Sequence, residues 1–225
     1  YLLIGMEGGW SLDYSTLKAR VEAPGVQADL ARVGLGDSLD LLGMLVLKES
    51  DIKAYTDRSP LHTDDNILLE FSAPVALYQR SHITLLEEMS SFRGTITELE
   101  IRWGREGKAF QERLNRIHQA RRHTVAGILS MEAGEGNRAI EEFEQAIILN
   151  PHDVQANFSL RDLAVTWGDQ HLQQGMVEGA VRLYQRILTI NPHLADVHYL
   201  LAQAYQSLGM DEQARASREE AHRLN

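Results

Sequence analysis

Two adjacent carboxylates, Asp64 and Asp65, are the residues best placed to do chemistry in this 225-residue chain. They follow Thr63 in a polar segment, residues 60–66, beside a short apolar run, Ile67–Phe71, that is predicted to be a strand. Paired carboxylates beside a strand could hold a cationic amine. The alternative is a turn in which both side chains accept hydrogen bonds from nearby backbone N–H groups. The residues by themselves leave both readings open.

Two further patterns point away from catalysis. Gly5, Gly8 and Gly9 lack the G-x-G-x-x-G spacing of a dinucleotide-binding loop, so the end of a strand explains them. The histidines include no i, i+4 pair accompanied by a carboxylate as third ligand, which argues against a metal site. We therefore expect no metal, no cofactor and no catalytic residue in this chain.

The formal net charge of −10 is unevenly spread. Residues 1–78 hold six basic and twelve acidic side chains, residues 79–123 hold nine and six, and residues 124–225 hold seven and fourteen. A nucleic-acid backbone needs clustered Lys and Arg, so the acidic C-terminal part predicts no nucleic-acid partner. The basic stretch is expected on a solvated helix face that complements the acidic segments; it consists of Arg113, Arg116, Arg121 and Arg122.

The absence of cysteine excludes a disulfide framework and fits a reducing compartment. The longest apolar run, residues 41–47, is too short to cross a bilayer, and no signal peptide is visible. We expect a soluble segment on the cytoplasmic face that does not itself insert into a membrane. The first residue is not Met, so we interpret the chain as a fragment, and transmembrane helices upstream would place its parent protein at a membrane.

Helices dominate the predicted elements of the N-terminal half. Asp13 caps a first short helix, Gly34 closes a second in a left-handed conformation, and Ser38 opens a third that is apolar nearly all round and so expected to be buried. Further along, Thr97-x-x-Glu100 is a capping-box pattern for a long helix whose apolar residues keep helical spacing.

The last hundred residues contain three similar units, residues 120–153, 154–194 and 195–225. Each has small residues where two helices of a unit would cross closely. These positions are Gly127, Ala139, Ala180, Ala202 and Ala214. Asn150–Pro151 and Asn191–Pro192 mark the boundaries, since proline disfavours helix in the preceding residue and can begin the next helix. The pattern resembles the tetratricopeptide repeat and implies an α-solenoid of three helix pairs.

The middle unit is longer than the others. Pro151 and Pro192 are 41 positions apart, about seven more than the standard period of this repeat. Seven residues make about two helical turns, so the insertion is expected to lengthen the helices of residues 154–174 without rotating their packing face.

The first helices of such an array line a concave groove, in which an extended peptide or a helix binds. The expected lining is Arg121, Thr124, Ile128, Gln155, Phe158, Asp162, Asp196, Tyr199, Gln203 and Gln206. Among these, Arg121 alone could help to hold a carboxylate, so the expected partner is a neutral or basic protein segment. The alternative is that the repeats serve only as a packing module in the parent protein, and an oligomer stays open.

The segment at residues 61–74, LHTDDNILLEFSAP, resembles the pattern L-N-T-D-D-x-P-x-L-E-F-x-A-P of bacterial spermidine-synthase-like proteins. It has His62 where the pattern has Asn, and it lacks the proline of the pattern. The resemblance covers residues 1–78 and implies the C-terminal remnant of a Rossmann-type aminopropyltransferase domain, in which Asp64 and Asp65 would contact substrate. The cofactor-binding loop and catalytic acids of that family would lie upstream of residue 1.

The sequence thus predicts a mainly α chain: a small α/β remnant over residues 1–78, a helical connector over 79–119, and a tetratricopeptide-type solenoid over 120–225. The first functional hypothesis is a protein-interaction module at the C-terminal end of a spermidine-synthase-like protein, not catalytic by itself. The alternative is a structural part of an active polyamine aminopropyltransferase.

Overall fold

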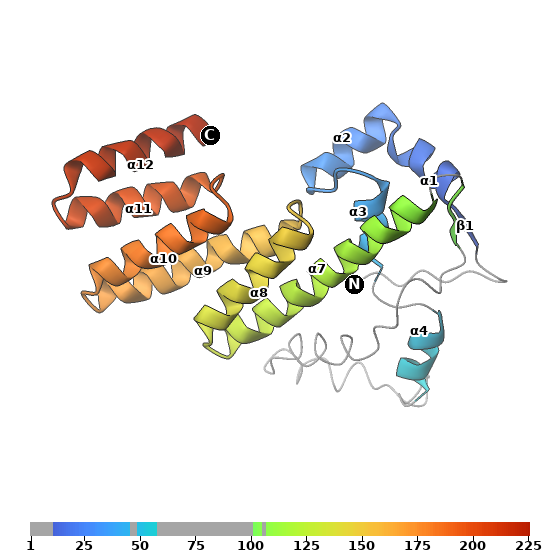
Figure 1. The fold of residues 1–225 in the computed structure, drawn as a ribbon, viewed down its shortest axis with the longest axis horizontal. Helices are drawn as coiled ribbons and strands as arrows, with labels where there is room; N and C mark the ends of the chain where they lie inside the picture. Colours follow the sequence, from blue (N-terminus) through green and yellow to red (C-terminus); the bar gives the residue numbers. More distant parts are fainter. Residues whose placement is uncertain (1–10, 46–48, 58–100, 105–106) are drawn as a thin grey trace, which may run out of the picture. The chain divides into compact units, whose positions relative to one another are not determined.

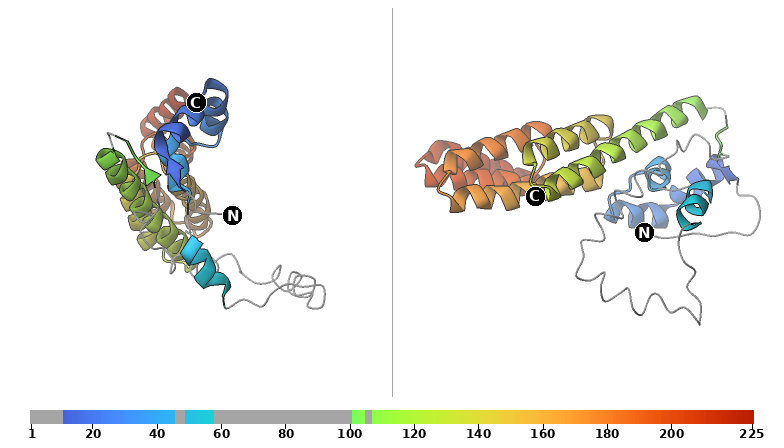
Figure 2. Two further views of the ribbon diagram at one scale, coloured as in Figure 1. Left: turned by 90° about the vertical axis from the view of Figure 1, so that its right-hand side faces the viewer. Right: turned by 90° about the horizontal axis from the view of Figure 1, so that it is seen from below.

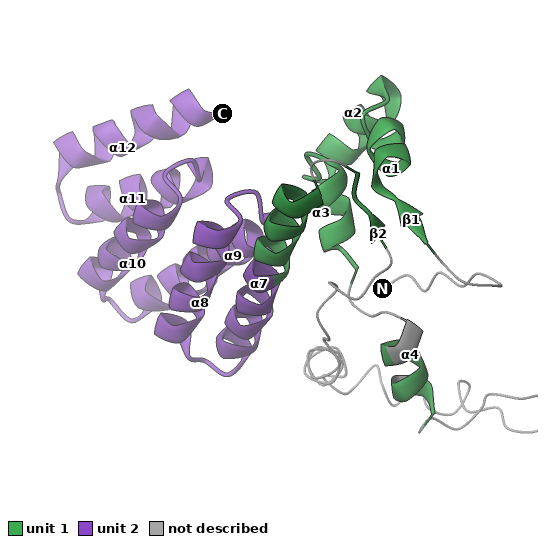
Figure 3. Ribbon diagram, turned by 45° about the vertical axis from the view of Figure 1, so that its right-hand side comes forward, with its two compact units in different colours: residues 1–118 green, residues 119–225 purple. Residues whose placement is uncertain are grey.

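The computed structural model describes residues 11–45, 49–57, 101–104 and 107–225. Within these residues the chain forms ten helices and two short strands. It divides into two compact units, residues 1–118 and 119–225 (Figure 3). The strand predicted at residues 67–71, and the strand whose end Gly5, Gly8 and Gly9 would mark, lie outside the described residues, so they stay predictions.

In the described part of the first unit, a short strand passes directly into a helix at Asp13. Strand β1 (Leu12–Asp13) pairs in parallel with β2 (Ile101–Arg102), and α1 (Tyr14–Val21) follows at once. The Asp13 carboxylate accepts a hydrogen bond from the backbone N–H of Thr16 at 2.9 Å, which satisfies one of the free donors of the first turn. The predicted cap at Asp13 is confirmed.

Helix α2 (Pro24–Arg32) begins with proline in its first turn and ends with the predicted left-handed glycine. Gly34 has φ of 77°, and the N–H of Leu35 donates to the carbonyl of Leu30 at 3.0 Å. This pairing closes the last turn of the helix, as expected where glycine follows it. No residue of α2 is buried.

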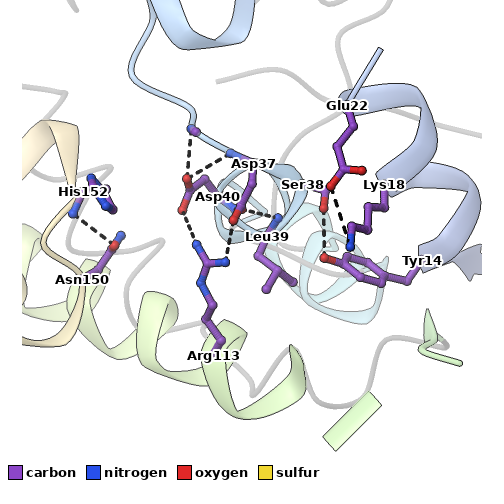
Figure 4. A network of polar contacts seen from close by, with 11 residues as sticks. Tyr14, Lys18, Glu22, Asp37, Ser38, Leu39, Asp40, Arg113, Asn150 and His152 are labelled. Carbon is purple, nitrogen blue, oxygen red and sulfur yellow. Dashed lines mark hydrogen bonds and ion pairs between the residues drawn. The ribbon is translucent and has the colours of Figure 1, made fainter. Parts of the chain in front are cut away.

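Helix α3 (Ser38–Gly43) corrects the prediction for its start. Asp37, not Ser38, caps it: the Asp37 carboxylate accepts from the N–H groups of Leu39 and Asp40, and Asp40 completes a capping box. The hydroxyl of Ser38 instead lies 2.9 Å from the hydroxyl of Tyr14, inside the unit (Figure 4). A short helix, α4 (Glu49–Thr56), follows.

The long helix α7 (Gly107–Glu132) begins ten residues after the predicted capping box at Thr97, and that prediction is wrong. Residues 101–102 form strand β2 instead, and Gly104, with φ of 70°, lies between strand and helix. Tertiary packing overrides the local pattern here, since Trp103 is placed with its ring 5.3 Å from that of Tyr14. The core of this unit contains Tyr14, Leu39, Leu42, Leu114 and Ile117.

Arg113 of α7 ties that helix to the start of α3 in the first unit. Its guanidinium reaches the Asp37 carboxylate at 2.5 Å and that of Asp40, which is 8% exposed, at 3.8 Å (Figure 4). The other Asp40 oxygen accepts from the backbone N–H of Gly36 at 3.0 Å. Arg113 therefore serves the packing of its own unit and is not a purely solvated charge.

The second unit is a row of antiparallel helices in which each packs on the next (Figures 1 and 2). After α7 come α8 (Gly136–Leu149), α9 (Val154–Gln173), α10 (Val177–Ile190), α11 (Ala195–Ser207) and α12 (Asp211–Leu224). The end of α7 pairs with α8, α9 with α10, and α11 with α12. The described fold is mainly α and is the predicted solenoid of three helix pairs.

One turn geometry recurs within all three pairs. Gly134, Gly175 and Gly209 have φ of 78°, 72° and 73°. In each turn, the glycine N–H donates to the carbonyl three residues back, and the next residue donates to the carbonyl five residues back. This is the Schellman pattern that ends a helix through a left-handed residue, so glycine is required there for its backbone and not for packing.

Small residues let the two helices of a pair approach closely. An added Cβ at Gly127 would lie 2.5 Å from the ring of Phe143, and one at Gly168 would lie 2.0 Å from the hydroxyl of Tyr184. All five small positions predicted from the sequence, Gly127 included, are buried. Close helix crossing in this unit is confirmed.

The seven extra residues of the middle unit lie at the N-terminal end of α9. This helix has 20 residues and α11 has 13. Seven positions separate Gly168 from the turn at Gly175, as they separate Ala202 from the turn at Gly209, so the ends of the two helices stay in register. The two added turns therefore contain Val154 and Phe158, whose side chains are 47% and 59% exposed.

Candidate functional site

A pocket of about 350 Å³ opens between the first helices of the second and third pairs and the end of α12. Its residues come from three helices that are far apart in the sequence. They are Arg161, Val165, Ala195, Asp196, Tyr199, Leu200, Ala221, His222 and Asn225. This volume lies at the small end of the range for ligand pockets, about 300–1,000 Å³.

An ion pair between α9 and α11 forms one edge of the pocket. The guanidinium of Arg161 contacts the carboxylate of Asp196, and both side chains are about half exposed. Since each charge is compensated by the other, the pair offers little attraction to an anionic ligand. Val165 and Tyr199 form the accessible apolar surface beside it, at 40% and 50% exposure.

Two carboxylates extend this surface along α9. Asp162 and Asp169 stand three positions before and four positions after Val165, so the three share one helix face. Both are exposed, and neither forms an ion pair with a described residue. Burial raises the pKa of the Tyr184 hydroxyl, and the nearby charge of Asp169 raises it further. The face is therefore apolar at Val165 and Tyr199 and acidic on either side.

The third helix pair places the predicted residues as the repeat pattern suggests. Asp196 and Tyr199 line the pocket, and Gln203 and Gln206 are exposed further along α11. The amide oxygen of Gln206 accepts a hydrogen bond from Arg218 of α12 at 3.0 Å.

The middle pair divides the predicted residues into two groups. Asp162 lies beside the pocket, whereas Gln155 and Phe158 belong to the added turns of α9 and do not line it. The predicted residues lie too early in α9 because the seven extra residues are at its N-terminal end, while its C-terminal end aligns with that of α11. Counting forward from Pro151 therefore places the predicted groove residues two helical turns before the pocket.

The first pair requires a correction at Thr124. Its side chain is 3% exposed and cannot meet a ligand. The Thr124 hydroxyl donates to the buried carboxylate of Asp153 at 2.9 Å, and that carboxylate also caps α9 through the N–H of Ala156. Ile128 packs partly against the core, and Arg121 is partly buried. Thr124 thus links α7 to the start of α9.

Sequence reasoning missed Arg161, Val165, Leu200 and His222. The sequence could have indicated Val165. When Gly168 is aligned with Ala202, Val165 aligns with Tyr199, one standard period of 34 residues later. No spacing pattern indicated Arg161 or His222, whose positions depend on how α9 and α12 meet α11.

The substrate carboxylates predicted from the sequence, Asp64 and Asp65, lie outside the described residues. Within the described part, no group of three His, Asp or Glu side chains is arranged to hold a metal ion. None of the helices described there is long and apolar enough to span a membrane.

Comparison with known proteins bears on the helix pairs. Residues 171–217 match the family model of the tetratricopeptide repeat. The match runs from the end of α9 into α12, and of the pocket residues it includes those of α11.

A solved structure titled "Crystal structure of MamA" is similar at 15% identity, with a TM-score of 0.34, over 80% of this chain and 96% of that one. A score of this size carries no argument about function. No curated protein matches the chain, so the resemblance to spermidine-synthase-like proteins stays a prediction from the sequence.

Proposed function

We propose that the tetratricopeptide unit, residues 119–225, binds a basic segment of a partner protein along the surface formed by Asp162, Val165, Asp169, Asp196 and Tyr199. The observation that carries the proposal is the pocket between α9, α11 and α12, with exposed apolar and acidic side chains beside it. Surfaces of stacked helix pairs commonly hold an extended peptide or a helix.

Charge supports a basic partner over an acidic one. The unit has nine arginines, no lysine and fourteen acidic residues. Arg161 is neutralised by Asp196, while Asp162 and Asp169 have no cationic neighbour within ion-pair distance among the described residues. Each exposed pair with a partner cation is worth about 0.2–1 kcal/mol, so binding should weaken as salt is added.

The test uses the full 225-residue chain and an array of peptides in which Lys, Asp or Ser alternates with apolar residues. Lysine peptides should bind best, and the double variant Asp162→Asn/Asp169→Asn should weaken that binding several-fold. The matched control is Glu178→Gln/Glu212→Gln, which removes the same charge from exposed positions of α10 and α12. Preference for aspartate peptides, or equal losses in the two double variants, would show the proposal to be wrong.

The finer identity of the parent protein is proposed from the sequence alone. A module at the end of a spermidine-synthase-like protein should not bind decarboxylated S-adenosylmethionine or putrescine through this chain. Saturable binding of either compound would favour the alternative, a structural part of an active aminopropyltransferase. Loss of that binding in Asp64→Asn/Asp65→Asn would assign it to the two adjacent carboxylates.

A further inference from the structure

We propose that the pocket between α9, α11 and α12 takes one large apolar side chain of the bound segment, next to the basic residues that Asp162 and Asp169 attract. This inference rests on the proposed function and adds what the partner must carry. Binding to the acidic face requires only basic residues in the partner, whereas the pocket adds the requirement for an apolar residue that anchors the segment.

The walls of the pocket are suited to an aliphatic or aromatic group. Val165, Leu200 and Tyr199 face it from α9 and α11, and Ala195 and Ala221 contribute no side chain beyond Cβ. Burying a Leu or Phe side chain in such surroundings is favourable by its transfer from water. The volume of about 350 Å³ suits one side chain with its flanking backbone and not a longer apolar segment.

The polar edge of the pocket disfavours an acidic occupant. The Arg161 guanidinium is held by Asp196, and the carboxylates of Asp162 and Asp169 stand on either side of Val165 along α9. Seven helical positions separate these two carboxylates, or about 10 Å of helix axis. A peptide in the polyproline II conformation spans this distance in about three residues, one full turn, so that both of its basic side chains lie on the same face. The structure therefore points to a motif with an apolar residue between two basic residues that are about three positions apart.

The test compares acetylated, amidated peptides of sequence Gly-Lys-Leu-Ser-Lys-Gly and Gly-Lys-Ser-Ser-Lys-Gly, which differ in one side chain. The leucine peptide should bind the full chain about ten-fold more tightly, the ratio expected for burying most of one aliphatic side chain. Because residues 119–225 contain no lysine, carbodiimide coupling should join the peptide lysines to Asp162 or Asp169 without internal cross-links in this unit.

Two matched variants assign the preference to the pocket. Ala195→Phe adds a side chain at a partly exposed lining position and should abolish the ten-fold ratio, while Ala216→Phe adds the same group on the exposed side of α12 and should keep it. Both should retain the helical circular dichroism of the parent chain. An unchanged ratio in Ala195→Phe, with binding still lost in Asp162→Asn/Asp169→Asn, would overturn the anchor and leave the proposed function standing. Equal binding of both peptides to the unaltered chain would also overturn it.

Discussion

Replacing Gly168 with alanine tests whether the close crossing of α9 and α10 holds the middle helix pair together. Two effects of opposite sign compete. Alanine is favoured over glycine inside a helix by about 1 kcal/mol. Against this, its Cβ would lie 2.0 Å from the Tyr184 hydroxyl oxygen and 2.5 Å from a ring carbon of the same side chain.

The steric effect should win because Tyr184 is fully buried and cannot turn away. Overpacking a core typically costs about 1–3 kcal/mol, so Gly168→Ala should lower the free energy of unfolding by about 1–2 kcal/mol. Tyr184→Phe removes the nearest clashing atom. It also removes a buried hydroxyl that has no hydrogen-bond partner among the described residues, so by itself it should be neutral or stabilise the chain by about 1 kcal/mol.

A double-mutant cycle gives the coupling free energy between the two substitutions, from urea unfolding curves that are followed by circular dichroism. Gly168→Ala should cost at least about 0.5 kcal/mol less in the Tyr184→Phe background, since the 2.0 Å contact is gone. Tyr205→Phe is the control: its hydroxyl accepts a hydrogen bond from Gln185 at 2.8 Å, so its loss should cost about 1 kcal/mol. A stabilising Gly168→Ala, or strict additivity in the cycle, would refute the reasoning.

Three further predictions concern turns, caps and alkaline stability. Gly175 has φ of 72°, so Gly175→Ala should lower the free energy of unfolding by about 1–2 kcal/mol. Gly25 lies in a helix, and a Cβ added there would have nothing within 4 Å, so Gly25→Ala should raise the free energy of unfolding by about 0.5–1 kcal/mol. The midpoints of urea unfolding measure both changes. Asp153→Ala should cost about 1–2 kcal/mol as a lost cap and leave the Thr124 hydroxyl without its acceptor, while Asp153→Asn should retain most of the stability in thermal unfolding. Burial raises the pKa of the Tyr184 hydroxyl in the folded chain. The stability that depends on this hydroxyl staying neutral is therefore fully present below the unfolded pKa of about 10 and is lost as pH rises through the folded pKa. Tyr184→Phe should accordingly unfold at higher pH than the unaltered chain in an alkaline titration.

Helix starts and ends in this chain were predictable where one residue type decides a local geometry. Asp13 caps α1 as its short side chain predicts, and Gly34 ends α2 because it adopts a positive φ without a Cβ penalty. The prediction failed at Thr97, since residues 101–102 pair with strand residues that are 89 positions earlier in the sequence. A capping pattern does not contain that distant partner.

The pocket and the helix face beside it show the same division. Asp196 and Tyr199 could be assigned from the sequence because α11 has the standard length of the repeat. The sequence predicts Gln155 and Phe158 in place of Val165 and Asp169, because the repeat length shows that seven residues are added but not at which end of α9 they lie.

The sequence by itself determined that the last hundred residues form helix pairs, because glycine turns, proline boundaries and small crossing residues each act within about one helical turn. Only the tertiary structure decided which side chains form the pocket, since Arg161, Tyr199 and Ala221 meet through the packing of three helices. It also decided that Thr124 is buried, because its hydrogen-bond partner, Asp153, lies 29 residues further along the chain. Such contacts depend on how helices are placed against one another, and no single stretch of sequence specifies that placement.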